Sequence, residues 1–94
     1  MNGSGKGARA ERRARHLLEG RGYTVVRSAA SKGPVDLVAW NGDGLKLVQV
    51  KSGQARPSAA ERAAFLLVCI PANATREFWV FRDRCVVPTI EWIE

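Results

Sequence analysis

Asp36, Gln49 and Lys51 place an acid, an amide and a lysine within a short stretch of the chain. Asp36 lies near the start of an apolar segment, and residues 41–44 carry the Asn-Gly and Asp-Gly signals of a tight hairpin. Side chains alternate along a strand, so Gln49 and Lys51 share one face. An antiparallel pair that turns at residues 41–44 brings residue 36 close to residues 49–51. We therefore expect the three polar groups to converge.

This combination suits the hydrolysis of a phosphodiester bond. That reaction uses a divalent metal to neutralise the phosphate and to activate water, and magnesium prefers oxygen ligands. Asp36 offers a carboxylate, Gln49 an amide oxygen and Val50 a backbone carbonyl. Lys51 could orient the attacking water or stabilise developing negative charge. The expected cofactor is magnesium, and no small-molecule cofactor is expected.

A second acid, Glu11, lies in a segment with helical periodicity that covers residues 8–20. Ala14 and Leu18 follow Glu11 at i+3 and i+7, so Glu11 borders the apolar stripe and could reach a site at the edge of the sheet. The alternative is an ion pair with Arg15 at i+4, worth only about 0.3–0.5 kcal/mol. Both interpretations are open at this point.

Positive charge is concentrated in the first third of the chain. Residues 1–32 contain eight basic and two acidic side chains, which account for the whole net charge of +6, whereas residues 33–94 contain seven of each. A uniform basic bias would serve solubility alone. The asymmetry is instead typical of a nucleic-acid binder.

The elements that must position these residues follow from periodicity and turn residues. We expect a flexible tail at residues 1–7 and a single domain at residues 8–94. A capping box at Ser58 and Glu61 predicts the start of a second helix, which should end near Val68. The expected strands are 23–28, 35–40, 45–51, 76–82 and 85–92. The fold class is therefore α/β, with order αβββαββ and a mixed β-sheet of about five strands flanked by helices.

Two further expectations concern the last strands. Pro88 predicts that the final strand is an edge strand or contains a bulge. Apolar side chains alternate on both faces of residues 78–81. This pattern predicts that one face packs in the core and that the other forms a dimer interface.

Composition excludes several classes of protein. No apolar run approaches the roughly 18 residues that a membrane span needs, and the N-terminus lacks the apolar segment of a secretory signal. We therefore expect a cytoplasmic (intracellular) protein with no membrane partner. One histidine and two cysteines without a CxxC pair argue against a zinc site.

Several short segments together resemble the archaeal-type Holliday junction resolvases of the PD-(D/E)xK nuclease superfamily. The segments are residues 11–14, 22–29, 31–33, 35–39 and 48–52, and the likeness covers roughly residues 6–56. The resemblance implies a restriction-endonuclease-like core. It also implies a homodimer that nicks branched DNA, a four-way junction, symmetrically, using magnesium or manganese as a substitute.

The resemblance also implies residue roles. Asp36 corresponds to a metal-binding aspartate, Lys51 to a catalytic lysine, and Glu11 to a helix glutamate that completes the metal site. Arg12 and Arg27 correspond to arginines that contact DNA or support the site, and Ser31 lies in a functionally sensitive loop. Charge, apart from the resemblance, adds the expected phosphate contacts Lys6, Arg9, Arg13 and Lys32.

Gln49 departs from the family pattern, which has glutamate there. Glutamine keeps the shape and one oxygen ligand but loses a charge, so it is either natural, with weaker metal affinity, or a change made to inactivate the protein. Four hypotheses remain: a junction resolvase, a junction-binding protein that has lost cleavage, a nuclease for another DNA substrate, and an RNA- or protein-binding module. Retention of Glu11, Asp36 and Lys51 together argues against the second and the fourth.

Overall fold

The computed structural model describes residues 3–28, 34–53 and 56–93. Within these ranges two helices and five strands follow the predicted order αβββαββ. The elements are α1 (Gly3–Gly20), β1 (Thr24–Arg27), β2 (Leu37–Trp40), β3 (Leu45–Ser52), α2 (Ala59–Leu66), β4 (Ala74–Phe81) and β5 (Thr89–Ile93).

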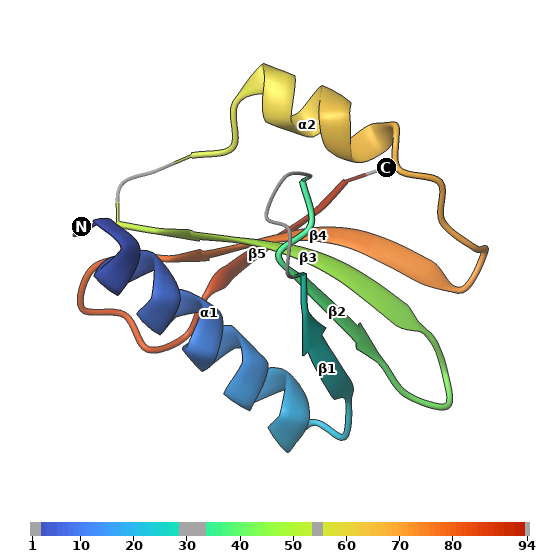
Figure 1. Cartoon of the computed structure of the whole chain (residues 1–94), viewed down its shortest axis with the longest axis horizontal. Coiled ribbons are helices and arrows are strands. Elements are labelled where there is room, and N and C mark those ends of the chain that lie inside the picture. Colours follow the sequence, from blue (N-terminus) through green and yellow to red (C-terminus); the bar gives the residue numbers. More distant parts are fainter. Residues whose placement is uncertain (1–2, 29–33, 54–55, 94) are drawn as a thin grey trace.

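The five strands form one mixed sheet in the order β1-β2-β3-β4-β5. The first three strands are an antiparallel meander, β4 runs parallel to β3, and β5 returns antiparallel. A parallel neighbour requires a crossover, and α2 provides it. The two helices lie on opposite sides of the sheet (Figure 1). The α/β class and the mixed five-stranded sheet are confirmed.

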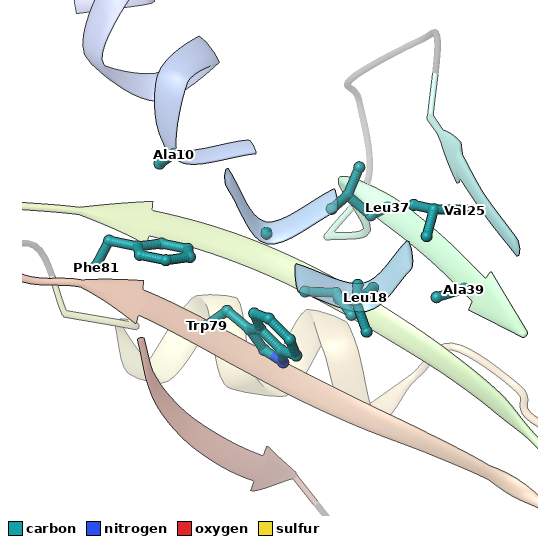
Figure 2. Packing of buried hydrophobic residues seen from close by; sticks show 9 residues of the cluster. Ala10, Leu18, Val25, Leu37, Ala39, Trp79 and Phe81 are labelled. Atoms are coloured by element: carbon teal, nitrogen blue, oxygen red, sulfur yellow. The ribbon is translucent and has the colours of Figure 1, made fainter. Parts of the chain in front are cut away.

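One face of the sheet packs against α1. The helix buries a stripe of Ala10, Ala14 and Leu18, which have the predicted spacing, and Ala14 and Leu18 are fully buried. The stripe belongs to one cluster with the strand residues Val25, Leu37, Ala39, Val48, Trp79 and Phe81 (Figure 2). Because Glu11 is on the same helix, this packing also fixes the position of Glu11 relative to the edge of the sheet.

The other face packs against α2. Phe65 of α2 meets Phe78 of β4 edge to face, with ring centroids 5.4 Å apart, and Leu47 and Ile93 complete the cluster. The four residues 78–81 are therefore buried within the chain, on both faces of β4. The prediction that one face of this strand forms a dimer interface is wrong, because the chain's own two helices cover both faces.

Several element boundaries differ from prediction. Helix α1 begins at Gly3, not at Ala8, and so includes residues of the segment expected to be a flexible tail. Strand β5 begins at Thr89, not at residue 85, because Pro88 has no N–H to donate to the ladder. As predicted, β5 is an edge strand. Among the helices of the described ranges, none is both long and apolar enough to cross a lipid bilayer.

Candidate functional site

Asp36 is fixed at the entrance to β2 by three hydrogen bonds. Its N–H donates to the Val48 carbonyl at 2.8 Å, and its carbonyl accepts from the Ser28 N–H at 2.9 Å. Its side-chain Oδ2 accepts from the Val50 N–H at 2.8 Å. The register of β2 against β3 ends at the pair Leu37 and Val48, and the contacts of Asp36 with Val48 and Val50 place it beside residues 48–50. The predicted approach of residue 36 to residues 49–51 is confirmed.

The Asp36 carboxylate is electrostatically unusual. Burial raises its pKa above the ordinary value of 3.8, and the nearby negative charge of Glu11 raises it further. The Val50 N–H, Lys51 and Arg27 all lower the pKa, but their combined effect is smaller. A half-buried acid with a raised pKa, close to a second acid and two cations, is typical of a functional site.

Gln49 and Lys51 project from β3 towards α2. The Lys51 Nζ forms an ion pair with Glu61 Oε2, and the Gln49 Nε2 donates to the same oxygen at 3.4 Å. The Lys51 hydrogen bond lowers the pKa of Glu61, so this carboxylate is ionised at neutral pH. An acid from the second helix thus contacts both polar residues of the β3 motif.

The Gln49 amide oxygen has no such contact. Among the described residues Oε1 of Gln49 is the one buried side-chain N or O atom without a hydrogen-bond partner. A buried carbonyl oxygen without a donor is unfavourable by about 1–3 kcal/mol, and a cation would satisfy it. In a β-strand the N–H and C=O of one residue point to the same side. The Val50 carbonyl therefore faces the Asp36 side, as its N–H does.

The oxygen atoms of Asp36, Gln49 and Val50 are suitable ligands for a hard divalent cation. They include fewer carboxylates than a binding site formed by protein ligands alone would have. Within residues 3–28, 34–53 and 56–93, no three carboxylate, imidazole or thiolate side chains form a cluster that could hold a metal. A site here would combine the Asp36 carboxylate with the neutral oxygens of Gln49 and Val50 and with water. Magnesium, which usually keeps several waters and uses one or two carboxylates, suits that set.

Glu11 reaches across from α1 to β1. Its Oε1 accepts from the Arg27 Nε at 3.0 Å, and its side chain is 24% exposed. Arg15 pairs instead with Glu19 at 3.2 Å. The alternative in which Glu11 pairs with Arg15 is therefore wrong. Glu11 is close enough to Asp36 for its charge to raise the Asp36 pKa, as expected for an acid that borders the site.

Basic side chains surround this region on α1. A cleft of about 180 Å³ lies between the helix and the start of β2 and is lined by Ala8, Glu11, Arg12, Arg15, Arg27 and Leu37. A second hollow of about 400 Å³ lies along the exposed face of the helix and is lined by Arg9, Arg12, Arg13, His16 and Leu17. Arg9 and Arg12 are exposed. They are free to meet a phosphate backbone.

The structure does not test four of the predicted DNA contacts, those of Lys6, Arg13, Ser31 and Lys32. Arg13 packs over the Phe81 ring at 5.7 Å and donates to the Cys85 carbonyl at 3.3 Å, so it braces α1 against the segment between β4 and β5. Its contact with DNA stays a prediction. Ser31 and Lys32 lie outside the described residues, as does the side chain of Lys6.

Glu61 is the site residue that sequence reasoning missed. The capping box was predicted and is confirmed: Glu61 Oε1 accepts from the Ser58 N–H at 2.9 Å. A capping carboxylate has a second oxygen. The packing of α2 against the sheet brings that oxygen to Lys51 on β3. Only the three-dimensional packing of α2 could reveal this, because residues 51 and 61 follow no local spacing rule.

Comparison with known proteins identifies the family. The sequence model of the archaeal Holliday junction resolvase family, Hjc, matches residues 2–64. The fold is similar to that of Hjc from Archaeoglobus fulgidus, a Holliday junction resolvase from an archaeal hyperthermophile. The TM-score is 0.74 at 24% identity, over 92% of this chain and 76% of that one. The family consists of metal-dependent nucleases that bind four-way DNA junctions. Because the family match covers well over half of its residues, the chain belongs to the archaeal Holliday junction resolvase family.

Proposed function

We propose that this chain is a structure-selective endodeoxyribonuclease that resolves four-way DNA junctions by metal-dependent phosphodiester hydrolysis. The observation that carries the proposal is the Asp36 site. A half-buried carboxylate is held by the Val50 N–H at 2.8 Å, next to Gln49 in the chain, with Lys51 and Glu11 close enough to shift its pKa. Family membership supports the substrate class.

The proposed chemistry divides between the metal and the side chains. A divalent ion, when bound, would neutralise the scissile phosphate and activate a water molecule. Asp36, Gln49 Oε1 and the Val50 carbonyl would hold that ion, with Glu11 completing its surroundings. Lys51 supplies a positive charge beside the site and orients water or stabilises the developing negative charge. Arg27 holds Glu11 in place through the 3.0 Å ion pair.

The proposed DNA path follows the basic side of α1. Arg12 lines the cleft that contains Glu11 and Arg27, and it shares the second hollow with Arg9. A phosphate backbone in the first cleft would pass close to Glu11 and to Leu37, the residue that follows Asp36. Phosphate contacts of this kind position the strand without reading its sequence. Selectivity for junctions would then come from shape.

A homodimer is part of the proposal, because each chain offers one such site. A four-way junction has two-fold symmetry, and a two-fold dimer could place one site on each of two strands. The two faces of β4 are already covered by the chain's own helices. The dimer contact must therefore use another surface.

Cleavage of a labelled synthetic four-way junction tests this function. Linear duplex, single-stranded and flap DNA serve as substrate controls, each in magnesium and in manganese, and Lys51→Ala serves as the matched protein control. We expect paired symmetric nicks in the junction alone, and none with Lys51→Ala despite retained junction binding. Preferential cutting of another substrate would reassign the nuclease. Tight binding without cutting would make the protein a junction-binding module.

A further inference from the structure

The two carboxylate oxygens of Glu61 do different things. Oε1 closes the capping box by accepting from the Ser58 N–H at 2.9 Å. Oε2 points across to β3 and contacts both Lys51 Nζ and Gln49 Nε2. The capping box fixes the carboxylate on the first turn of α2, so Oε2 has little freedom to leave the β3 side chains.

This contact determines which way the Gln49 amide faces. Only the NH₂ end of an amide can donate, and the C=O end would repel a carboxylate. With Glu61 ionised, Nε2 must face Oε2, and Oε1 must then face away. That is the buried oxygen that has no partner in the described part of the chain. Glu61 therefore leaves the Gln49 oxygen as an unsatisfied acceptor, one residue before Val50, whose N–H holds the Asp36 carboxylate.

The same contact restores the negative charge that glutamine lacks. A glutamate at position 49 would offer a charged oxygen directly. Here the charge lies one hydrogen bond further out, on Glu61, and polarises the amide that donates to it. Removal of a group that hydrogen-bonds to a metal ligand and orients it commonly weakens metal affinity by about 10–100-fold.

We propose that Glu61 is a positioning residue for the metal site: it fixes the Gln49 amide with Oε1 towards the cation, holds Lys51 beside it, and supplies the charge that position 49 has lost. This inference rests on the proposed metal-dependent function. It makes Gln49 and Glu61 one unit, so the effects of changing the two residues are coupled. It also means that Gln49 is compatible with an active site.

Mn²⁺ binding to the DNA-free protein, measured by titration calorimetry, tests the unit without relying on cleavage. Glu61→Gln keeps an oxygen acceptor for the helix cap but removes the charge. We expect it to weaken Mn²⁺ binding by about tenfold or more. Ser58→Ala is the matched control, because it removes the Oγ that accepts from the Glu61 N–H at 3.0 Å and leaves Oε2 in place. It should lower the melting temperature while leaving Mn²⁺ affinity within about twofold of the wild type.

The exchange of the two side chains gives a second readout. Gln49→Glu alone sets two carboxylates against each other and should lower the melting temperature of the metal-free protein. The double variant Gln49→Glu with Glu61→Gln restores one acid and one amide, and should recover both the melting temperature and Mn²⁺ affinity. Wild-type affinity in Glu61→Gln, or additive effects in the double variant, would overturn the inference. A wild-type protein that neither binds Mn²⁺ nor cuts a junction would overturn the proposed function instead.

Discussion

Asp36 is a residue at which function and stability are in opposition. Its carboxylate is half-buried, and burial raises its pKa above 3.8. A raised pKa means that the folded state holds the proton more tightly than the unfolded chain does, so ionisation destabilises the fold. The stability of the protein therefore falls, through this group, as pH rises from about 3.8 through the folded-state pKa. A bound metal ion would offset the destabilisation caused by the ionised Asp36, as expected for a cation-binding site.

Asp36→Asn should stabilise the metal-free protein and abolish cleavage. The asparagine oxygen can still accept from the Val50 N–H, but the buried charge is gone. We expect a gain of about 0.5–2 kcal/mol in the free energy of unfolding at neutral pH, the usual size of a single stabilising substitution. The gain should vanish below the ordinary pKa of 3.8, where both proteins are neutral at this position. Urea unfolding across pH measures it, and an unchanged or lowered stability at neutral pH would contradict the assignment.

Glu77 is a buried acid whose pKa is lowered, in contrast to the raised pKa of Asp36. It is 1% exposed and accepts from Lys46 Nζ at 2.7 Å, Thr75 Oγ1 at 2.6 Å and Trp79 Nε1 at 2.8 Å. Burial raises its pKa, but these hydrogen bonds outweigh that effect and hold the pKa below 4.5. Its contribution to stability is therefore present above pH 4.5 and is lost as pH falls through the folded-state value.

Glu77→Ala should destabilise the fold by about 3–5 kcal/mol, because it leaves the Trp79 N–H buried without an acceptor and the Lys46 ammonium, whose side chain is only 21% exposed, without its carboxylate. Glu91→Ala is the matched control on the adjacent strand. Glu91 pairs with Arg62 at the surface and is 43% exposed, so its loss should be about 1 kcal/mol or less. Chemical denaturation at pH 7 compares the two variants. Equal losses would mean that burial does not decide the strength of these pairs.

At the scale of elements, α1 joins the core to the site. Leu18 is fully buried against the sheet, in the same cluster as Trp79 (Figure 2). Glu11, two turns earlier on the same helix, faces Arg27 on β1. The position of the acid therefore depends on how firmly the helix docks.

Leu18→Ala should lower the free energy of unfolding by about 2–5 kcal/mol, since it leaves a cavity under α1. Leu67→Ala, at a side chain that is 86% exposed beyond α2, should change it by no more than about 0.5 kcal/mol. Thermal melts and denaturant titrations provide the comparison. A small effect at Leu18 would show that α1 is not anchored by this stripe.

The elements were largely predictable because their signals are local. Helical spacing identified the stripe of α1, the Asn41–Gly44 turn identified the β2–β3 hairpin, and that hairpin alone brought Asp36 to Val50. The burial of β4 on both faces was not predictable, because it depends on where α2 packs against the sheet in the crossover between β3 and β4. The same limit hid Glu61, whose capping pattern says nothing about its second oxygen.

At the scale of the whole molecule, charge is unevenly distributed. All of the net positive charge comes from residues 1–32, and α1 holds five of the eight basic side chains of that segment. Binding to DNA would then release counterions mainly from the phosphates that this helix touches. Net charge and specific placement make different predictions, because only placement distinguishes an arginine in the middle of α1 from one beyond its C-terminal end.

Arg12→Ala and Arg21→Ala remove the same charge from different places. Arg12, in the middle of α1, lines both hollows, one of which contains Glu11 and Arg27, whereas Arg21 follows the C-terminal end of the helix. If Arg12 makes a phosphate contact, its loss should weaken junction binding and reduce the slope of log K against log salt by about one. Arg21→Ala should leave the slope unchanged. Fluorescence anisotropy over a salt series measures both. Equal slopes for the two variants would mean that the DNA is attracted by overall charge and does not lie along this part of α1.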